Sequence, residues 1–123
     1  MKIFHYESVE AKDAGGESSG VRIRWLITQE MGAENFAMRL FELEPGGFTP
    51  FHIHGWEHEV FVLEGSGVVV GGDEERLFRA GDVVFIASNE KHQFRNVGTG
   101  IAKILCLIPN KDGLVKASSC GCG

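Results

Sequence analysis

The sequence predicts an all-β domain, either a sandwich or a barrel, and three observations support this class. Glycine accounts for 17 of the 123 residues and proline for only 3, a ratio that suits many tight turns. Glycine-rich turns recur about every 8–12 residues between apolar runs. Within those runs apolar and polar residues alternate, as along residues 21–28, where two arginines separate branched and aromatic side chains. We therefore expect one domain built from short strands.

The elements are expected in the following order along the chain. Residues 2–8 are predicted to form a first strand or arm, and the turn-rich stretch after it is predicted to be a flexible loop up to residue 20. Residues 28–34 are the one candidate for a short helical turn. The predicted strands after the arm cover residues 21–28, 36–43, 51–54, 59–63, 67–70, 76–79, 83–86, 92–96 and 101–108. The chain is thereby divided into an N-terminal strand and loop (1–20), a barrel (21–110) and a C-terminal tail (111–123).

Composition and charge narrow the classes of function. The formal net charge is −5, whereas nucleic-acid binding depends on clustered lysine and arginine, so no nucleic-acid partner is expected. No apolar run approaches the roughly 20 residues that cross a bilayer, so no membrane partner is expected. The first residues also lack the pattern of a secretory signal. Three cysteines, an odd number, favour a reducing compartment, and we expect the protein in the cytoplasm.

Four of the five histidines follow a spacing that suits metal binding. His52 and His54 stand two residues apart, so in a strand their side chains share a face about 6.5–7 Å apart. Gly55 permits a bend, after which His58 returns on the next strand from the same side, while His92 comes from a distant strand. A His-x-His pair alone could be structural, but four imidazoles packed in a small barrel without a metal would be costly. We therefore predict that His52, His54, His58 and His92 bind a metal ion.

With these histidines in place, the chain resembles a cupin over residues 36–108. The first cupin motif reads Gly-x5-His-x-His-x3–4-Glu-x6-Gly, and the positions that fall on it are Gly46, His52, His54, His58 and Gly65. The second motif reads Gly-x5-Pro-x-Gly-x2-His-x3-Asn, and the positions that match it are Gly81, His92 and Asn96. The resemblance implies an all-β protein with the cupin double-stranded β-helix, a jelly-roll barrel of the RmlC-like kind.

Three residues depart from these motifs. His58 stands where the family usually has a glutamate ligand, and Glu57 and Glu59 flank it. Glu59 would satisfy the longer x4 spacing, but only His58 satisfies the x6-Gly half of the motif, so we favour His58 as the inward-facing residue. Ala87 replaces the motif proline and Asn89 replaces its glycine. Because asparagine tolerates the left-handed backbone conformation, we expect the turn to be kept.

The pattern also resembles a small subgroup of single-domain cupins that have four histidine ligands. In that subgroup Trp-Glu-His-Glu follows the His-x-His pair and Cys-Leu-Ile-Pro closes the last strand, as residues 56–59 and 106–109 do here. The resemblance implies a compact homodimer that binds one divalent transition metal, commonly manganese, through the four histidines. Imidazole also suits Fe, Cu, Ni, Co and Zn, so the residues themselves leave the metal open.

Side-chain alternation predicts the lining of a substrate pocket. If Lys103 on the last strand faces outward, Ile104 and Cys106 face inward. If His92 faces inward, Phe94, two residues later, does so as well. Glu42 and Glu44 are expected to face outward, and a bend follows His54. Together these positions give six candidates: Arg39, Phe41, Trp56, Phe94, Ile104 and Cys106.

These candidates leave alternatives open. Arg39 could pair with a substrate carboxylate or with a glutamate at the rim of the barrel. Trp56 could guard the entrance or simply pack, and Cys106 suits a small apolar filler better than a ligand. Cys120 and Cys122 in the tail could bind a soft metal or form a mixed disulfide, and we treat them as incidental to the chemistry of the barrel.

These features favour a metal-dependent enzyme with oxygenase-like chemistry on a small organic substrate, anions included. Four neutral imidazoles leave the double positive charge of the ion in place, which attracts anionic or enolisable ligands. Two other hypotheses stay open. One is a non-catalytic cupin that binds or senses a small-molecule ligand with a structural metal. The other is a metal-dependent isomerase or decarboxylase, which would be indifferent to dioxygen.

Overall fold

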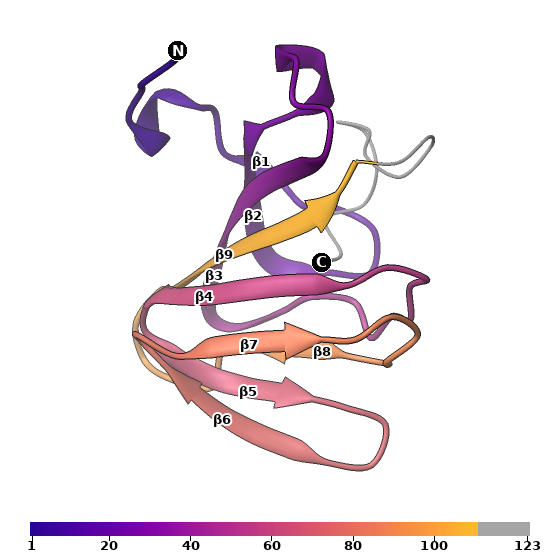
Figure 1. The fold of residues 1–123 in the computed structure, drawn as a ribbon. Coiled ribbons are helices and arrows are strands. Elements are labelled where there is room, and N and C mark those ends of the chain that lie inside the picture. The colour runs from indigo at the N-terminus through magenta and orange to yellow at the C-terminus, as the bar shows by residue number, and fades with distance from the viewer. Residues whose placement is uncertain (111–123) are drawn as a thin grey trace.

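A computed structural model describes residues 1–110, which form antiparallel strands curled into a barrel (Figure 1). The strands are β1 (Lys12–Asp13), β2 (Ser19–Ile27), β3 (Phe36–Phe48), β4 (His58–Glu64), β5 (Ser66–Val70), β6 (Glu75–Arg79), β7 (Val83–Ile86), β8 (Gln93–Arg95) and β9 (Ala102–Pro109). Two short 3₁₀ turns cover Tyr6–Ser8 and Gln29–Met31. Within this part of the chain no helix could span a membrane. The predicted all-β class is confirmed.

The sheet is continuous from β6 at one end to β7 at the other. Its order is β6-β5-β8-β3-β9-β4-β7, and β2 joins β3 and carries β1. The long strand β3 makes this possible, because its first half pairs with β2 and β9 whereas Phe48 at its end pairs with Arg95 of β8. The chain therefore folds as a curled sheet whose two ends, β6 and β7, are not paired with each other in the described residues.

The core lies on the concave side and follows strand alternation. On β9 the residues Ala102, Ile104, Cys106 and Ile108 are buried and their neighbours are partly exposed, which confirms the inward side predicted for this strand. The same alternation on β3 buries Phe41, as predicted. Burial of these side chains supplies most of the stabilising free energy, at roughly 25 cal/mol per Å² of apolar surface.

The predicted strand at 51–54 was wrong, and of the strand or arm predicted for residues 2–8 the strand alternative was wrong. Residues 2–8 do not pair with the sheet; their only regular element is the turn at Tyr6–Ser8, which is fixed by hydrogen bonds from Ser8 N to His5 O and from Glu7 N to His5 Nδ1. Residues 51–54 contribute only one isolated bridge, in which His52 pairs with His92. In both segments local apolar residues suggested a strand, but no neighbouring strand pairs along their length.

The motif turns have the backbone conformations that the sequence indicated. Asn89 has φ 65°, so the asparagine does replace the motif glycine in the left-handed region. Gly65 has φ 82°, and a Cβ there would lie 2.6 Å from the carbonyl oxygen of Ile101, so this turn requires glycine. Asn96, the last residue of the second motif, is buried and donates to the carbonyl oxygens of Leu43 and Gly100.

Candidate metal centre

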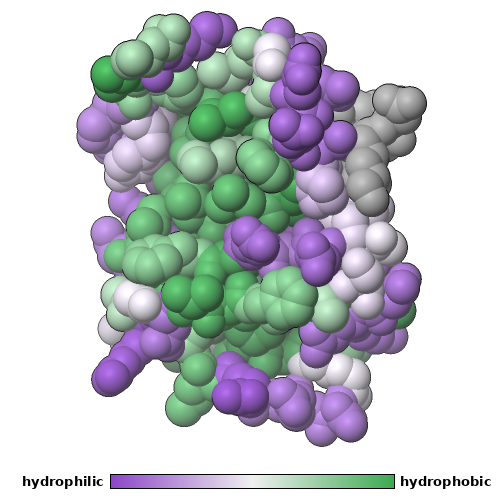
Figure 2. Space-filling view, in the orientation of Figure 1, coloured by the Kyte–Doolittle hydropathy of each residue, from purple (hydrophilic) through white to green (hydrophobic). Residues whose placement is uncertain are grey.

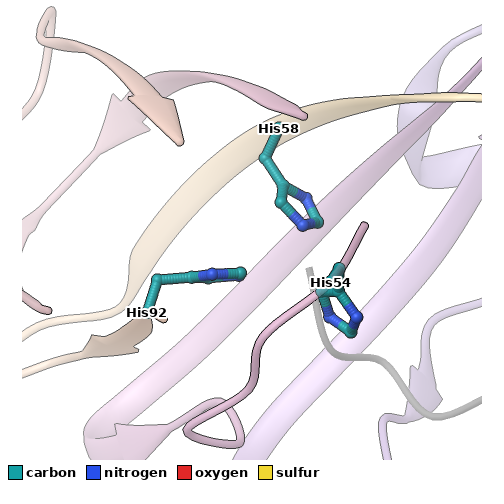
Figure 3. A group of neighbouring side chains, drawn as sticks. All are labelled: His54, His58 and His92. Atoms are coloured by element: carbon teal, nitrogen blue, oxygen red, sulfur yellow. The ribbon is translucent and has the colours of Figure 1, made fainter. Parts of the chain in front are cut away.

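Three imidazoles from separate parts of the chain converge inside the barrel. His54 lies in the connector between β3 and β4, His58 begins β4, and His92 directly precedes β8. One ring nitrogen from each lies within 4.8 Å of the other two, and the rings face a common space (Figure 3). The ring centroids are 4.7 Å apart for His58 and His92 and 5.3 Å apart for His54 and His58. This is the arrangement in which three nitrogens can close on one ion.

His58 is the most buried member of the cluster, with 1% of its surface exposed. Burial is the main cause that lowers the pKa of His58 to about 2, and the nearby charges of His92 and Arg39 lower the pKa in the same direction. The ring is therefore neutral at physiological pH and keeps a lone pair. Its Nε2 is buried and has no hydrogen-bond partner among residues 1–110. A buried nitrogen of this kind fits a metal ligand, since an unsatisfied polar atom is otherwise costly.

His92 is oriented by the chain immediately before it. Its Nδ1 lies 2.9 Å from the carbonyl oxygen of Glu90. A carbonyl oxygen can only accept, so Nδ1 carries the proton and Nε2 carries the lone pair. This is the usual arrangement for a metal-binding histidine, whose second nitrogen is held by a hydrogen bond to the protein. His92 is 2% exposed, so its orientation is set within the core.

The fourth predicted ligand, His52, lies beside the cluster. Its backbone pairs with that of His92 through two hydrogen bonds of 3.0 and 2.9 Å, and its ring centroid is 5.4 Å from that of His54. Its Nε2 lies 3.4 Å from Glu17 Oε1, and a quarter of its side chain is exposed. The structure thus brings His54, His58 and His92 together and places His52 next to them, where it contacts a carboxylate.

The tryptophan predicted at the bend packs against the metal cluster. Trp56 stacks on His54, with ring centroids 4.4 Å apart and an interplanar angle of 14°. Trp56 is partly buried and also contacts the hydrophobic core. Glu57 and Glu59 on either side of His58 are exposed, as strand alternation indicated.

Arg39 and Cys106 form a buried chain of contacts that ends at His58. Arg39 is 1% exposed and donates from its Nη2 to Cys106 Sγ at 3.1 Å. Cys106 Sγ lies 3.6 Å from His58 Nδ1. The guanidinium also lies 5.0 Å from the centroid of the Phe41 ring. Burial raises the pKa of the Cys106 thiol, so the sulfur is protonated and neutral. Arg39 and Cys106 therefore lie behind a candidate ligand.

The other predicted pocket residues belong to the hydrophobic core. Phe41, Phe94 and Ile104 are each at least 96% buried and form one cluster with Cys106. The ring of Phe94 lies 6.4 Å from that of His92, so this phenylalanine forms part of the wall next to the imidazoles. Alternation along β3, β8 and β9 placed these residues correctly on the inner face, whereas their predicted contact with a substrate stays a prediction.

A cavity of about 470 Å³ leads from the surface to His92. We call it the seam, because it lies between the two ends of the sheet: β5 and β6 form one wall and β7 forms the other. Val84 and Ile86 line the β7 wall, and Phe78 and Arg76 line the β6 wall. Its size is within the range of small-molecule sites.

Two residues near the cluster were not predicted from the sequence. Glu17 reaches His52 from the loop before β2, and nothing in its local sequence marks that approach. Arg76 lines the seam, and its alternation with Phe78 along β6 was a signal that could have found it.

Comparison with protein families and curated proteins gives one family. The sequence profile of the family described as "Cupin domain" matches residues 39–108. An uncharacterized protein of Methanocaldococcus jannaschii is 32% identical over 62 residues, which are 50% of this chain and 50% of that protein. The chain therefore spans about half the length of this curated relative.

Solved structures resemble the whole barrel. A polyketide cyclase, RemF from Streptomyces resistomycificus, matches with a TM-score of 0.85 and 33% identity over 90% of this chain and 80% of its own. A predicted oxalate decarboxylase from Thermotoga maritima matches with a TM-score of 0.78 and 24% identity, over 89% of this chain and 100% of its own. An RmlC-like cupin from Shewanella frigidimarina matches with a TM-score of 0.75 and 17% identity, over 92% and 94%. The predicted jelly-roll barrel is confirmed.

Proposed function

The chain belongs to the cupin family, and from this premise we propose that it is a metal-dependent enzyme acting on a small organic substrate. The proposed ligands are His54, His58 and His92, with His52 as the fourth. The reaction we propose first is oxygenase-like. A divalent ion bound there would supply Lewis acidity and open coordination positions for substrate.

The observation that carries the proposal is the convergence of three imidazoles inside the barrel. Three ring nitrogens lie within 4.8 Å of one another, and the buried Nε2 of His58 has no hydrogen-bond partner among residues 1–110. The donor set consists of nitrogens alone, so it adds no negative charge to offset that of the ion. Phe94 and Trp56 flank the histidines and limit access of water to them.

The experiment compares metal content and turnover in the same preparations. Wild type, His58→Ala and His52→Ala are analysed for bound metal and for dioxygen uptake with a panel of small carbonyl and phenolic compounds. We expect about one equivalent of metal in wild type and metal-dependent dioxygen uptake that His58→Ala abolishes. Binding of metal without turnover of any compound would instead support a non-catalytic cupin that binds or senses a ligand.

A redox-neutral reaction is the second candidate, and one observation favours it. The polyketide cyclase RemF is 33% identical over 90% of this chain. Cyclisation, isomerisation and decarboxylation all use a Lewis acid to stabilise negative charge on an enolate-like substrate and need no dioxygen. The same turnover under argon and under air would favour this candidate over the oxygenase.

We propose manganese as the resident metal, on the resemblance to cupins with four histidine ligands. Imidazole binds most first-row metals, and copper binds such sites more tightly than manganese, so affinity alone does not select it. Anomalous scattering from crystals of protein purified without added metal would identify the ion. A signal from iron, nickel, cobalt, copper or zinc alone would contradict manganese.

We also propose that the protein is a homodimer, because two apolar surfaces are exposed. Figure 2 shows apolar side chains gathered over β4, β7 and β9. Phe61 and Val83, which are paired across β4 and β7, are 43% and 76% exposed. Ile3 and Phe4 of the N-terminal arm are also exposed. Patches of this kind often mark interfaces between subunits.

Sedimentation equilibrium tests the dimer. Wild type is compared with Phe61→Lys and with a chain that lacks residues 1–4, which removes Ile3 and Phe4 but keeps His5 and the turn at Tyr6–Ser8. We expect a dimer for wild type and a lower mass for at least one variant. A monomeric wild type would contradict the dimer.

The remaining proposals concern location and other partners. A buried free thiol at Cys106 suits a reducing compartment, and we propose the cytoplasm. The net charge of −5 supports a small-molecule partner and no nucleic acid.

A further inference from the structure

The seam is lined by an arginine, Arg76, whose position on β6 is on the same side of the sheet as the metal cluster. On β6, Arg76 lies two residues from Phe78, so both side chains leave the strand on the same face. Phe78 is 4% exposed and its ring lies 6.0 Å from that of Phe94, which shows that this is the inner face. Arg76 therefore leaves β6 on the inner face, and because β6 is the last strand at that end of the sheet the side chain is largely exposed to solvent.

The register of the strands relates Arg76 to His92. Arg76 is opposite Val69 on β5, and Val69 is opposite Phe94 on β8. Two strand spacings amount to about 10 Å, and His92 is two residues further along the same face as Phe94. The cavity that joins them includes both Arg76 and His92 in its lining. A molecule of a few carbon atoms can therefore contact both ends.

The walls of the seam combine apolar side chains with charged ones. Val84 and Ile86 face the cavity from β7, and Val69 faces it from β5. Ile86 is paired with His58, so the apolar wall extends up to the metal cluster. A ligand that contacts these three side chains presents an apolar surface to them.

Besides Arg76, the charged residues that line the seam are Glu74, Asp82, Glu90 and Lys91. Lys91 Nζ lies 4.6 Å from the centroid of the Phe51 ring. Asp82 and Glu90 accept hydrogen bonds from the backbone nitrogens of Arg79 and Ala87 at 2.9 and 3.0 Å, so their carboxylates are used in turns. Glu74 lies 3.7 Å from Arg76 Nη1, and 62% and 78% of the two side chains are exposed. An exposed pair at this distance contributes little, so a ligand carboxylate can replace Glu74.

We propose that Arg76 binds the carboxylate of the substrate at the outer end of the seam. The substrate is then a small organic monocarboxylate whose apolar part contacts Val69, Val84 and Ile86 and whose other end reaches the metal cluster. Arginine suits this role because its planar fork binds a carboxylate through two parallel hydrogen bonds. The identity of the inner end rests on the proposed function, whereas the carboxylate site rests on the seam alone.

Calorimetric titration with a matched pair of probes tests the site. The probes are 4-methylpentanoate and its neutral amide, and each is titrated into the metal-free and the metal-loaded protein. Arg76→Gln is the test variant. Arg79→Gln is its control, because Arg79 lies on the outer face of the same strand. Both arginines are exposed, so neither change is expected to shift the melting temperature.

We expect Arg76→Gln to weaken binding of the carboxylate by about tenfold or more and Arg79→Gln to change it less than about twofold. Glu74→Gln should tighten binding, since it removes the competing carboxylate. The amide should bind more weakly to wild type and be insensitive to Arg76→Gln. Equal losses in the two arginine variants, or equal binding of acid and amide, would overturn the site.

The outcome is separable from that of the proposed function. If wild type shows metal-dependent turnover and Arg76→Gln binds the probe as wild type does, the carboxylate site is overturned and the proposed enzymatic function stands. An intact effect of Arg76→Gln in a protein without metal-dependent turnover would support the site and contradict the enzyme.

Discussion

The two pairs of histidines are held in place by different means. His58 begins β4 and His92 directly precedes β8, and both are almost completely buried. His52 and His54 lie in the connector between β3 and β4, where both are partly exposed. A strand sets the direction of a side chain through its pairing, whereas a connector needs further contacts to do so. The buried pair, at the start of β4 and just before β8, is thus held within the core, whereas the partly exposed pair in the connector is held by local contacts and by the bridge from His52 to His92.

The largest difference between strand and connector is expected in stability. Phe41→Ala removes a ring that is 1% exposed in the core, and we expect it to lower the free energy of unfolding by about 3–5 kcal/mol. Phe51→Ala in the connector, where the ring is 41% exposed, should cost less than about 1 kcal/mol. Urea denaturation followed by tryptophan fluorescence measures both. Similar losses would show that the connector is as tightly packed as the sheet.

The next largest difference between the two pairs of histidines is expected in their contribution to metal affinity. We expect His58→Ala to weaken metal binding by more than about 100-fold, because changes behind a ligand alone often cost 10–100-fold. His52→Ala should weaken it by about tenfold, since this ring already has Glu17 as a neighbour. Competition with a chelator measures both constants, and exposed His5 provides the control as His5→Ala. A larger loss for His52→Ala than for His58→Ala would reverse the assignment of core and peripheral ligands.

A smaller effect is expected at the turn that precedes His92. Asn89 has φ 65°, so Asn89→Ala should destabilise by about 1–2 kcal/mol, because alanine is strained in the left-handed region. Asn89→Gly should be close to neutral, since glycine adopts this conformation freely. Thermal unfolding of both variants makes the comparison. Equal stability of the two would mean that the turn relaxes when its residue changes.

The smallest effect is expected where the N-terminal segment contacts the outside of the sheet. Lys103 Nζ donates to Tyr6 Oη at 3.1 Å, and this hydrogen bond is the main cause that raises the pKa of Lys103. Because the pKa of Lys103 is raised in the folded state, protonated Lys103 stabilises the fold. This stabilisation is fully present below pH 10.5, the usual lysine pKa, and is lost as the pH rises through the folded-state pKa.

Tyr6→Phe should therefore lower stability by less than about 1 kcal/mol at neutral pH, and the difference from wild type should shrink above pH 10.5. Urea denaturation between pH 7 and 11 measures it. In a Lys103→Met background the same change should have no effect, and a persistent difference there would assign the contact to packing of the ring.

Most of the sheet could be predicted from the sequence, because alternation and glycine turns are local signals. The inward side of β9 followed from one outward lysine, Lys103, and the left-handed turn followed from the chemistry of Asn89. The predicted strand at 51–54 failed because its residues alternate correctly but find only one bridge, at His52. Strand formation depends on a partner, and no local pattern reports one.

Parts of the candidate site depended on tertiary contacts that the sequence does not encode locally. The approach of Glu17 to His52 joins residues 35 positions apart through a loop. Arg39 was predicted to face inward, which is correct, but its contact with Cys106 behind His58 depends on the register of β3 with β9. The family motifs identified the candidate ligands, whereas the residues that contact these ligands could be read only from the fold.

The position of β9 has a consequence for how the protein is made. The strand lies between β3 and β4 and pairs with both, although it is the last strand of the described chain. A ribosome-bound chain that ends before Ala102 has β3 and β4 but lacks the strand that joins them. Its half-built sheet exposes two unpaired edges and apolar side chains, which makes such intermediates prone to association. Pairing of β9 with β3 and β4 is therefore the step that completes the sheet.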